Sequence, residues 1–382
     1  MPKAPVRLRP LILSIVGTRP EGIKMAPVVR ALAERPALDQ ELVLTGQHRG
    51  LAEMFDLPAH AIHLLGVDLS EQTAGEICEA VRDALCRHLS RHRPDLVLVQ
   101  GDTSSALAGA LAAKDCGIPI GHVEAGLRSG DLLQPWPEEG HRVRIDALSD
   151  ILFAPSDAAA RNLAAEPQVR GAVHITGNSG IDALFHARSL CPAGPSSGER
   201  RMVLVTCHRR ENQGAQLWKI AAALKRMARE LPLEIVFPLH TNPHLRRSVH
   251  QLLGREADVV LIDPVDHAQM VCLMDRAWLI LTDSGGLQEE GPALGKPVLV
   301  LRNTTERGEA VESENLKLVG TDPERIFAAV SLLLREPERY ARMSRPSFPF
   351  GHGGAAPKIA ELVEDFLNPR PAELAPLTLI GE

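Results

Sequence analysis

Three acidic side chains in the first half of the chain lie at or just after the ends of predicted strands. Asp102 follows the apolar run Leu96–Val99, Glu124 follows Ile118–Val123, and Glu138 stands in the next loop. A single carboxylate in such a place is most often a helix cap. Three of them in successive loops favour a shared site, where carboxylates could take a proton from a substrate and stabilise a developing positive charge.

Cationic side chains accompany these acids. The run Leu11–Val16 leads into Gly-Thr-Arg-Pro-Glu-Gly-Ile-Lys, in which Arg19 and Lys24 flank the predicted start of a helix. Free backbone amides at that start, together with the two cations, could hold a phosphate or a carboxylate. A solvated helix start with two surface cations fits the spacing equally well. Arg142 lies near Glu138 in the sequence, where an ordinary ion pair is the plainer interpretation.

A complementary set of residues lies in the second half of the chain. Ser284, Gly285 and Gly286 open a predicted helix after the run Trp278–Thr282. Such small residues allow backbone amides to approach an anion, although turn geometry alone also explains a Gly-Gly pair. Glu290, one or two turns into that helix, could accept hydrogen bonds from ribose hydroxyls.

A histidine follows the first strand of this second half. His208 could be a core residue, but it lies beside Arg209 and Arg210 at a strand end. That setting favours a role facing an anion.

Several cofactor and partner classes lack their signatures. Neither the P-loop pattern nor G-x-G-x-x-G is present, so NAD bound in the usual Rossmann manner is not expected. None of the six cysteines forms a C-x-x-C pair, and we find no Cys, His or Asp spacing typical of a metal site. The formal net charge of -6 argues against nucleic-acid and anionic-membrane partners. We therefore expect no metal and no redox cofactor.

The elements that position these residues follow from hydrophobic patterning. Continuous apolar runs that alternate with helical patterns indicate parallel strands buried on both faces. Two such series predict two doubly wound, Rossmann-like α/β domains, with the ligand in the cleft beyond the carboxyl ends of the strands. The expected strands are Leu11–Val16, Glu41–Leu44, Leu96–Val99, Ile118–Val123, Ile151–Ala154, Val173–Thr176, Met202–Thr206, Glu234–Phe237, Val259–Ile262, Trp278–Thr282 and Pro297–Leu301.

We place the first domain over residues 1–189 and the second over residues 200–350. The segment Leu190–Glu199 between them is rich in Pro, Gly and Ser and is predicted to be a linker. The Pro-rich end of the chain from Asn368 is expected to fray. Two further helices are expected near Pro323–Leu334 and Ala356–Leu367.

The cellular compartment is predicted from the absence of membrane-spanning and signal segments and from the scattered positions of the cysteines. No apolar run reaches the ~18 residues needed to span a bilayer, and the run near the N-terminus is too short for a signal-peptide core. Scattered single cysteines are typical of a reducing compartment. The sequence thus predicts a soluble, cytoplasmic protein.

Taken in order, these segments resemble the bacterial UDP-N-acetylglucosamine (UDP-GlcNAc) 2-epimerases of the non-hydrolysing kind. The resemblance runs from about residue 11 to residue 365. It implies a fold like that of the GT-B glycosyltransferases, with a C-terminal helix at about 355–368 packing back on the N-terminal domain, and a homodimer. The motifs that carry it are GTRPEGIKMAPVV, TGQHR, GDTSSALAGALAA, HVEAGLRSGD, PWPEE, TGNSGIDAL, TCHRREN, LTDSGGLQEEGPALGKPVLVLRNTTER and LVGTD.

The resemblance also implies residue roles. It makes the C-terminal domain the nucleotide-binding one. The catalytic residues that it implies are Asp102, Glu124, Glu138 and His208. The substrate-binding residues that it implies are Arg19, Lys24, Arg142, Ser284, Gly285, Gly286, Glu290 and Arg307. The positions that hold a second UDP-GlcNAc as an activator in some members are matched by Gln47, Gln72, Arg209 and His240.

The implied reaction is the reversible epimerisation of UDP-GlcNAc to UDP-N-acetylmannosamine (UDP-ManNAc). The proton on C2 of the sugar has no adjacent carbonyl and is not acidic. Loss of UDP from C1 creates oxocarbenium character that acidifies it, so that a carboxylate can take it and leave 2-acetamidoglucal. Re-addition of UDP, with a proton on the other face, gives the epimer. Such chemistry needs carboxylates near the sugar and cations near the diphosphate.

Three alternatives remain open from the sequence. A GT-B glycosyltransferase would share the fold and the nucleotide site but would need an acceptor. A hydrolysing 2-epimerase would release free ManNAc and UDP, and the intact GTRPE segment favours the non-hydrolysing branch. A sugar-nucleotide sensor without activity would not need the acids.

Overall fold

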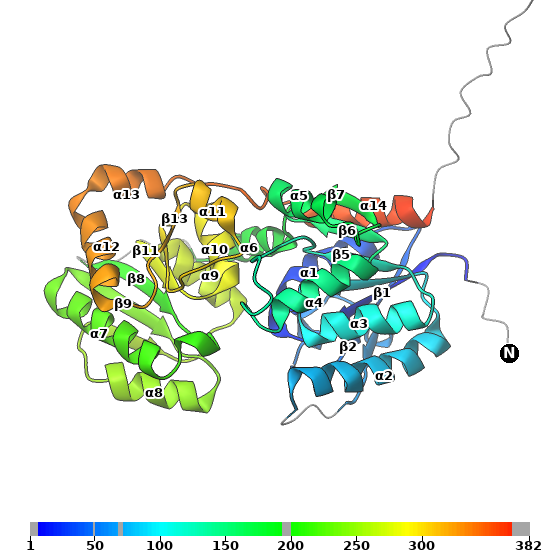
Figure 1. Cartoon of the computed structure of the whole chain (residues 1–382), viewed down its shortest axis with the longest axis horizontal. Coiled ribbons are helices and arrows are strands. Elements are labelled where there is room, and N and C mark those ends of the chain that lie inside the picture. Colours follow the sequence, from blue (N-terminus) through cyan, green and yellow to red (C-terminus); the bar gives the residue numbers. More distant parts are fainter. Residues whose placement is uncertain (1–6, 49, 68–71, 193–199, 369–382) are drawn as a thin grey trace, which may run out of the picture.

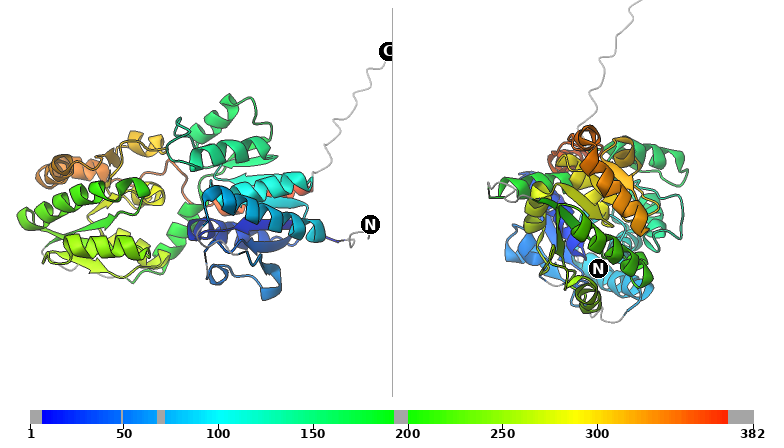
Figure 2. Two further views of the ribbon diagram at one scale, coloured as in Figure 1. Left: turned by 60° about the horizontal axis from the view of Figure 1, so that its bottom comes forward. Right: turned by 90° about the vertical axis from the view of Figure 1, so that its left-hand side faces the viewer.

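Two parallel β-sheets, each covered by helices, form two lobes (Figure 1). The structure is a computed structural model and describes residues 7–48, 50–67, 72–192 and 200–368. The segment from residue 193 within the predicted linker, and the predicted frayed end beyond residue 368, lie outside the described residues. The left view of Figure 2 shows the two lobes side by side.

The first sheet has seven strands in the order β3-β2-β1-β4-β5-β6-β7, and every pair in it is parallel. The strands are β1 (Leu11–Val16), β2 (Asp39–Leu44), β3 (Ile62–Leu64), β4 (Leu96–Gln100), β5 (Ile120–Val123), β6 (Ile151–Ala154) and β7 (Ala172–Ile175). The helices are α1 (Arg19–Ala33), α2 (Ala74–His92), α3 (Ser104–Asp115), α4 (Glu138–Leu148), α5 (Asp157–Ala165) and α6 (Ser179–Ser189), with short 3₁₀ turns η1 (Ala52–Met54) and η2 (Ala59–Ala61).

The second sheet has six parallel strands in the order β10-β9-β8-β11-β12-β13. The strands are β8 (Arg201–Thr206), β9 (Leu233–Pro238), β10 (Val259–Ile262), β11 (Leu279–Thr282), β12 (Val298–Val300) and β13 (Leu316–Leu318). The helices that follow residue 200 in the chain are α7 (Ala215–Glu230), α8 (Pro243–Leu253), α9 (His267–Arg276), α10 (Gly285–Ala293), α11 (Gly308–Glu312), α12 (Pro323–Arg335), α13 (Pro337–Met343) and α14 (Ala355–Leu367), with the 3₁₀ turn η3 (Arg210–Asn212).

The strand order places the ends of particular strands next to one another. In both sheets the order reverses beside the first strand, between β1 and β4 and between β8 and β11. Loops leave the carboxyl ends of these neighbouring strands in opposite directions, which opens a crevice at each reversal. The two crevices face each other across the gap between the lobes.

The expected fold class of two doubly wound α/β domains is confirmed. Each apolar run expected to be a strand is one, with ends that shift by two residues at most. The sequence analysis did not predict the edge strands β3 and β13 or the short helix α13. The two strands span three residues each and carry an exposed or half-buried polar residue, His63 or Lys317, in the middle, so no apolar run marks them.

Two helices connect the lobes. The last helix, α14, crosses back from the second lobe and packs against α1 and α6. It is the red helix in Figure 1. Its residues Ile359, Ala360 and Val363 are fully buried in one cluster with Ile12 of β1. Helix α6 contacts α1 on one side and α9 and α10 on the other, and its Leu184 belongs to the core of the second lobe.

A disulfide joins Cys191, just after α6, to Cys272 of α9. The prediction from cysteine spacing treated all six cysteines as single residues. It missed this pair because the partners lie 81 residues apart in the sequence. No helix among the described residues is long and apolar enough to cross a bilayer.

The return of α14 predicts a stability effect. Ile359 has no exposed surface, so Ile359→Ala leaves a cavity between α14 and the sheet. We expect a loss of about 2–5 kcal/mol in the free energy of unfolding, measured by urea denaturation. Glu361→Ala, an exposed position of the same helix, is the control and should change stability by less than about 0.5 kcal/mol. Equal stability of both variants would contradict this packing.

Candidate active site

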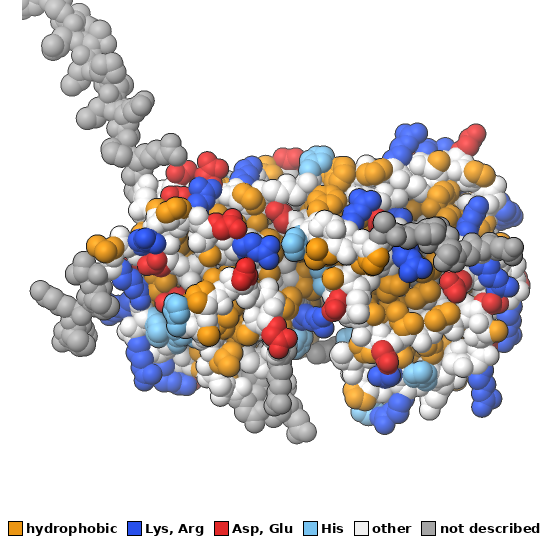
Figure 3. All heavy atoms as spheres, turned by 180° about the vertical axis from the view of Figure 1, so that it is seen from behind, with side chains coloured by type: hydrophobic (Ala, Val, Ile, Leu, Met, Phe, Trp, Pro, Cys, Tyr) orange, Lys and Arg blue, Asp and Glu red, His pale blue; other side chains and the backbone are white. Residues whose placement is uncertain are grey.

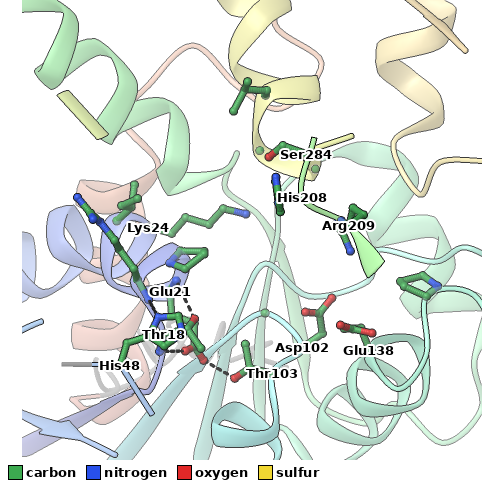
Figure 4. A pocket seen from close by; sticks show the side chains of 18 of the residues that line it. Thr18, Glu21, Lys24, His48, Asp102, Thr103, Glu138, His208, Arg209 and Ser284 are labelled. Carbon is green, nitrogen blue, oxygen red and sulfur yellow. Dashed lines mark hydrogen bonds between the residues drawn. The ribbon is translucent and has the colours of Figure 1, made fainter. Parts of the chain in front are cut away.

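A cavity of ≈1020 Å³ lies between the lobes and is lined by loops from the carboxyl ends of both sheets. Figure 4 shows its residues: Asp102 and Glu138 point into it from the first lobe, and His208 and Ser284 from the second. All of the residues assigned to the site from sequence line this one cavity. They are Arg19, Lys24, Gln47, Gln72, Asp102, Glu124, Glu138, Arg142, His208, Arg209, His240, Ser284, Gly285, Gly286, Glu290 and Arg307.

Asp102 follows β4 and is held by Arg142 of α4. The guanidinium of Arg142 pairs with Asp102 through one nitrogen and with the buried Glu139 through the other, at 2.9 Å. Glu139 in turn accepts a hydrogen bond from the backbone N–H of Ser129 at 2.9 Å. Burial alone would raise the pKa of Asp102, but the adjacent Arg142 outweighs it and keeps the pKa below its usual value. Asp102 is therefore a carboxylate at neutral pH.

Glu138 lies at the first position of α4, beside Asp102 in Figure 4. Its Oε2 atom is buried and has no hydrogen-bond partner among the described residues. Buried polar atoms are almost always paired in proteins, so an unpaired carboxylate oxygen in a cavity marks a place where a ligand can bind.

Glu124 is the third acid, and its backbone is strained. It has φ +69°, in the left-handed region that residues other than glycine adopt rarely and mostly at functional sites. Its carboxylate pairs with Lys24 and accepts a hydrogen bond from Gln100 at 2.7 Å. Burial would lower the pKa of Lys24, but Glu124 and the nearby Glu289 hold it above its usual value. The ammonium is thus charged inside the cavity.

Arg307 lies at the centre of the contacts between the lobes. Its guanidinium pairs with Glu289 at 2.6 Å and with Glu306, both from the second lobe. It also lies 3.7 Å from Glu124 of the first lobe. Burial opposes its charge, but these carboxylates raise its pKa well above the ordinary value. Asn178 of the first half donates to Glu289 at 2.6 Å and completes the arrangement.

The start of α10 presents backbone to Arg307. A Cβ atom built on Gly285 would lie 2.9 Å from a guanidinium nitrogen of Arg307. The side chain of Ser284 at the N-cap accepts no hydrogen bond from the helix. The first amides of α10 and the Arg307 cation therefore lie together at the cavity, in the arrangement that binds phosphate oxygens.

Asp283 positions His208. The fully buried Asp283 carboxylate accepts hydrogen bonds from the backbone N–H groups of His208 and Arg209, both at 2.9 Å, and lies 3.3 Å from the His208 ring. Burial, Arg209 and His240 lower the pKa of His208 more than Asp283 raises it. His208 is therefore mainly neutral at neutral pH and can accept or donate a proton. Its ring stacks on His240 with centroids 5.6 Å apart.

Glu21 fixes the first loop of the cavity. It is buried, forms a capping box with Thr18, and accepts hydrogen bonds from Gly17 N–H at 3.0 Å and Thr103 Oγ1 at 2.6 Å. Figure 4 shows the contacts of Glu21 with Thr18 and Thr103 as dashed lines. Burial raises the pKa of Glu21. The loops after β1 and β4 are thus tied together.

The residues matched to the activator positions lie in the same cavity. Gln47 accepts a hydrogen bond from Ser105 at 2.9 Å, and His48 beside it accepts one from the backbone N–H of Arg19 at 3.0 Å. His240 is stacked on His208. These contacts place the loop after β2 against the loop after β1.

Sequence reasoning missed the residues that hold the site residues in place. Their sequence neighbours offered some signal: Glu139 lies three residues before Arg142, and Glu289 and Glu306 directly precede Glu290 and Arg307. Spacing alone cannot show which of two adjacent glutamates is buried. The full set that was missed comprises Glu21, Gln100, Glu139, Asp283, Glu289 and Glu306.

Known proteins resemble this chain over nearly its whole length. The family model for UDP-N-acetylglucosamine 2-epimerase matches residues 30–364. The chain is 42% identical over 372 residues to the UDP-N-acetylglucosamine 2-epimerase of Escherichia coli K12, which covers 93% of this chain and 98% of that protein. Its counterpart in Bacillus subtilis is 41% identical over 359 residues, with 92% and 94% covered.

Solved structures are similar as well. UDP-GlcNAc 2-epimerase from Neisseria meningitidis bound to UDP-GlcNAc superposes with a TM-score of 0.86 at 37% identity, over 92% of this chain and 99% of that chain. Sucrose-phosphate synthase from Thermosynechococcus elongatus, at 13% identity and a TM-score of 0.66, shares the fold.

The contact between Gly285 and Arg307 predicts a steric effect. Because Glu289 and Glu306 hold the guanidinium, Arg307 cannot move freely away from a new methyl group. Gly285→Ala should therefore lower the free energy of unfolding by about 1–3 kcal/mol, measured by urea denaturation without ligand. Gly286→Ala, whose Cβ would meet only Glu290 at 3.8 Å, is the matched control. A Gly285→Ala protein as stable as its control would show that this close approach imposes no constraint.

Proposed function

Because the chain belongs to the UDP-N-acetylglucosamine 2-epimerase family, we propose that it interconverts UDP-GlcNAc and UDP-ManNAc by eliminating UDP and adding it back. The chain is an enzyme of this family. The observation that supports the proposed mechanism best is the grouping of Asp102, Glu124 and Glu138 in one cavity with Arg307 and the start of α10. Acids for the sugar and cations for the diphosphate thus face the same space.

The proposed first step breaks two bonds and forms two. A carboxylate takes the proton from C2, and the C–H electron pair becomes the second bond between C1 and C2. The bond from C1 to the diphosphate oxygen breaks, and its electron pair leaves with UDP. The products are 2-acetamidoglucal and UDP. In the return step a proton is delivered to the opposite face of C2 and the diphosphate oxygen attacks C1.

Two faces of one carbon require two proton-transfer groups. Asp102 and Glu138 lie side by side, whereas Glu124 is held separately by Lys24. We infer that the transfers are divided among these three carboxylates. The unpaired oxygen of Glu138 can contact the substrate directly, since no described residue competes for it. The carboxylates that do not carry the proton stabilise the positive charge at C1.

The departing diphosphate needs positive charge that is already in place. Arg307 and the amides at the start of α10 supply that charge, and the neutral His208 ring can donate a hydrogen bond, so that together they stabilise the negative diphosphate without reorganisation. Glu290, 3.5 Å from His267, is our candidate for the ribose hydroxyls.

A second nucleotide sugar could share the cavity. The cavity has ≈1020 Å³, at the upper end of the ~300–1,000 Å³ that is usual for one ligand, and the four residues matched to the activator positions line it together with the other site residues. We propose that Gln47, Gln72, Arg209 and His240 contact an activating UDP-GlcNAc. The homodimer that the family resemblance implies is likewise our proposal.

Solvent exchange tests the reaction. During turnover of UDP-GlcNAc in D₂O, the UDP-ManNAc formed should carry deuterium at C2, because the abstracted proton exchanges before the return step. NMR of the product measures it. Epimerisation without label would disprove proton abstraction. Unchanged UDP-GlcNAc that reacts only with an acceptor would indicate a glycosyltransferase, and free ManNAc with UDP a hydrolysing enzyme.

Substitution of the acids tests the residue roles. Asp102→Asn, Glu124→Gln and Glu138→Gln should each lower kcat by roughly 10²-fold or more, the scale of general acid–base catalysis. KM should change less, because the diphosphate is held mainly by the second lobe. Arg307→Ala should instead weaken UDP binding, measured by calorimetry.

Asp157→Asn, at an exposed acid outside the cavity, is the matched control and should keep full activity. If the three acids were only caps or ion pairs, their loss would cost about 1 kcal/mol of stability. Near-normal kcat with a lowered melting temperature in all three variants would refute the catalytic assignment.

A further inference from the structure

Three histidines lie together on the first lobe, away from the cavity. His88 and His92 are one turn apart on α2, and His63 lies on the edge strand β3. The last turn of α2 leads directly to the amino end of β4. This cluster is therefore near the amino ends of the strands, whereas the cavity lies beyond their carboxyl ends. In Figure 3, seen from behind, a group of histidine side chains lies at the surface of the first lobe.

The three imidazoles are close enough to share one ion. One ring nitrogen from each of His63, His88 and His92 lies within 4.8 Å of the others. The ring centroids are 4.0 Å apart for His88 and His92, 4.8 Å for His63 and His92, and 4.9 Å for His63 and His88. Zinc holds each such nitrogen at ~2.0–2.1 Å from the ion, so the three rings turn toward one shared point when they bind it.

A carboxylate lies beside the histidines. Glu41 of β2 is 2.9 Å from His63 Nε2 and 3.8 Å from His92 Nδ1. Metal-binding histidines are typically oriented by such a carboxylate, which also offsets the charge of the ion. The side chains of Glu41, His63 and His92 retain about a quarter to a third of their exposure, so an ion can enter from solvent.

His88 is the least satisfied member of the cluster. Its Nε2 atom is buried and has no hydrogen-bond partner among the described residues. A ring nitrogen without a partner can offer its lone pair to a metal ion.

We propose that His63, His88 and His92, with Glu41 beside them, form a binding site for one divalent transition-metal ion of the zinc type. Three imidazole nitrogens are a donor set that suits Zn²⁺ and Co²⁺, and Glu41 orients the rings, whereas Mg²⁺ or Ca²⁺ would require more oxygen ligands. A bound ion links the β2–β3 edge of the sheet to the end of α2. Its role is to stabilise this edge and not to take part in the reaction in the cavity.

The sequence analysis missed this site. The spacing of four between His88 and His92 places both on one face of a helix, but one such pair is a weak signal. Only the folded structure brings His63 and Glu41 next to this pair, because His63 lies on the edge strand β3, which the sequence analysis did not predict.

Metal binding to the full-length protein, stripped with a chelator, tests the proposal. Calorimetry with Zn²⁺ should give one site per chain, and Co²⁺ should give the visible absorption of a tetrahedral complex. Zn²⁺ should also raise the melting temperature, because it binds only the folded state. His88→Gln and His92→Gln should each weaken Zn²⁺ binding by about 10-fold or more, and Glu41→Gln by about 10-fold.

His250→Ala, at an exposed position of α8, is the matched control and should bind Zn²⁺ as the unsubstituted protein does. The Gln variants keep side-chain volume, and their melting temperatures without metal show that they fold. Absence of binding by the unsubstituted protein, or undiminished binding by the double variant His88→Gln/His92→Gln, would overturn the proposal. Epimerase activity should be unchanged after chelation. If chelation abolished the activity of the double variant and Zn²⁺ restored it, the ion would bind in the cavity and not at the histidines.

Discussion

The ion pairs of Arg307 are the interaction on which the arrangement of the two lobes depends. A guanidinium that is almost fully buried contacts Glu289 and Glu306 of its own lobe and approaches Glu124 of the other. Removing one partner of a buried ion pair typically costs about 3–5 kcal/mol, because the other charge is left unpaired. These charges are therefore kept together, and they hold Glu124 of the first lobe beside Arg307 and the start of α10 in the second.

That contact exists because of where parallel sheets end. Glu124 follows β5, and Arg307 follows β12, so both lie at carboxyl ends of strands. The two sheets face each other with these ends inward. Helix α6 packs against α1 on one side and against α9 and α10 on the other, and α14 returns from the second lobe to pack against α1. Buried hydrophobic packing thus sets the distance at which the charges meet.

Much of this could be predicted from the sequence, for a physical reason. Strands buried on both faces must be continuously apolar, so the central strands and the polar residues at their ends are visible as patterns. The site residues predicted from those strand ends all line one cavity. Edge strands such as β3 bury little and leave no such pattern. Glu139 was missed because spacing cannot show that it, and not the adjacent Glu138, is the buried acid, and Asp283 and Glu289 were missed because partners such as His208 and Asn178 come from distant parts of the chain. The disulfide partners Cys191 and Cys272 were missed for the same reason.

The strained backbone of Glu124 shows how the site uses the stability of the surrounding fold. A left-handed conformation costs a non-glycine residue about 1–3 kcal/mol and persists only where the surroundings impose it. Here the backbone N–H groups of Glu124 and Ala125 both donate to the carbonyl of Phe153 on β6, at 3.1 Å, while Lys24 and Gln100 hold the carboxylate. The neighbouring strand therefore bends the chain so that the carboxylate faces the cavity and not the solvent. An ordinary extended exit from β5 would carry this acid away from Arg307, and the charges of the two lobes would no longer meet.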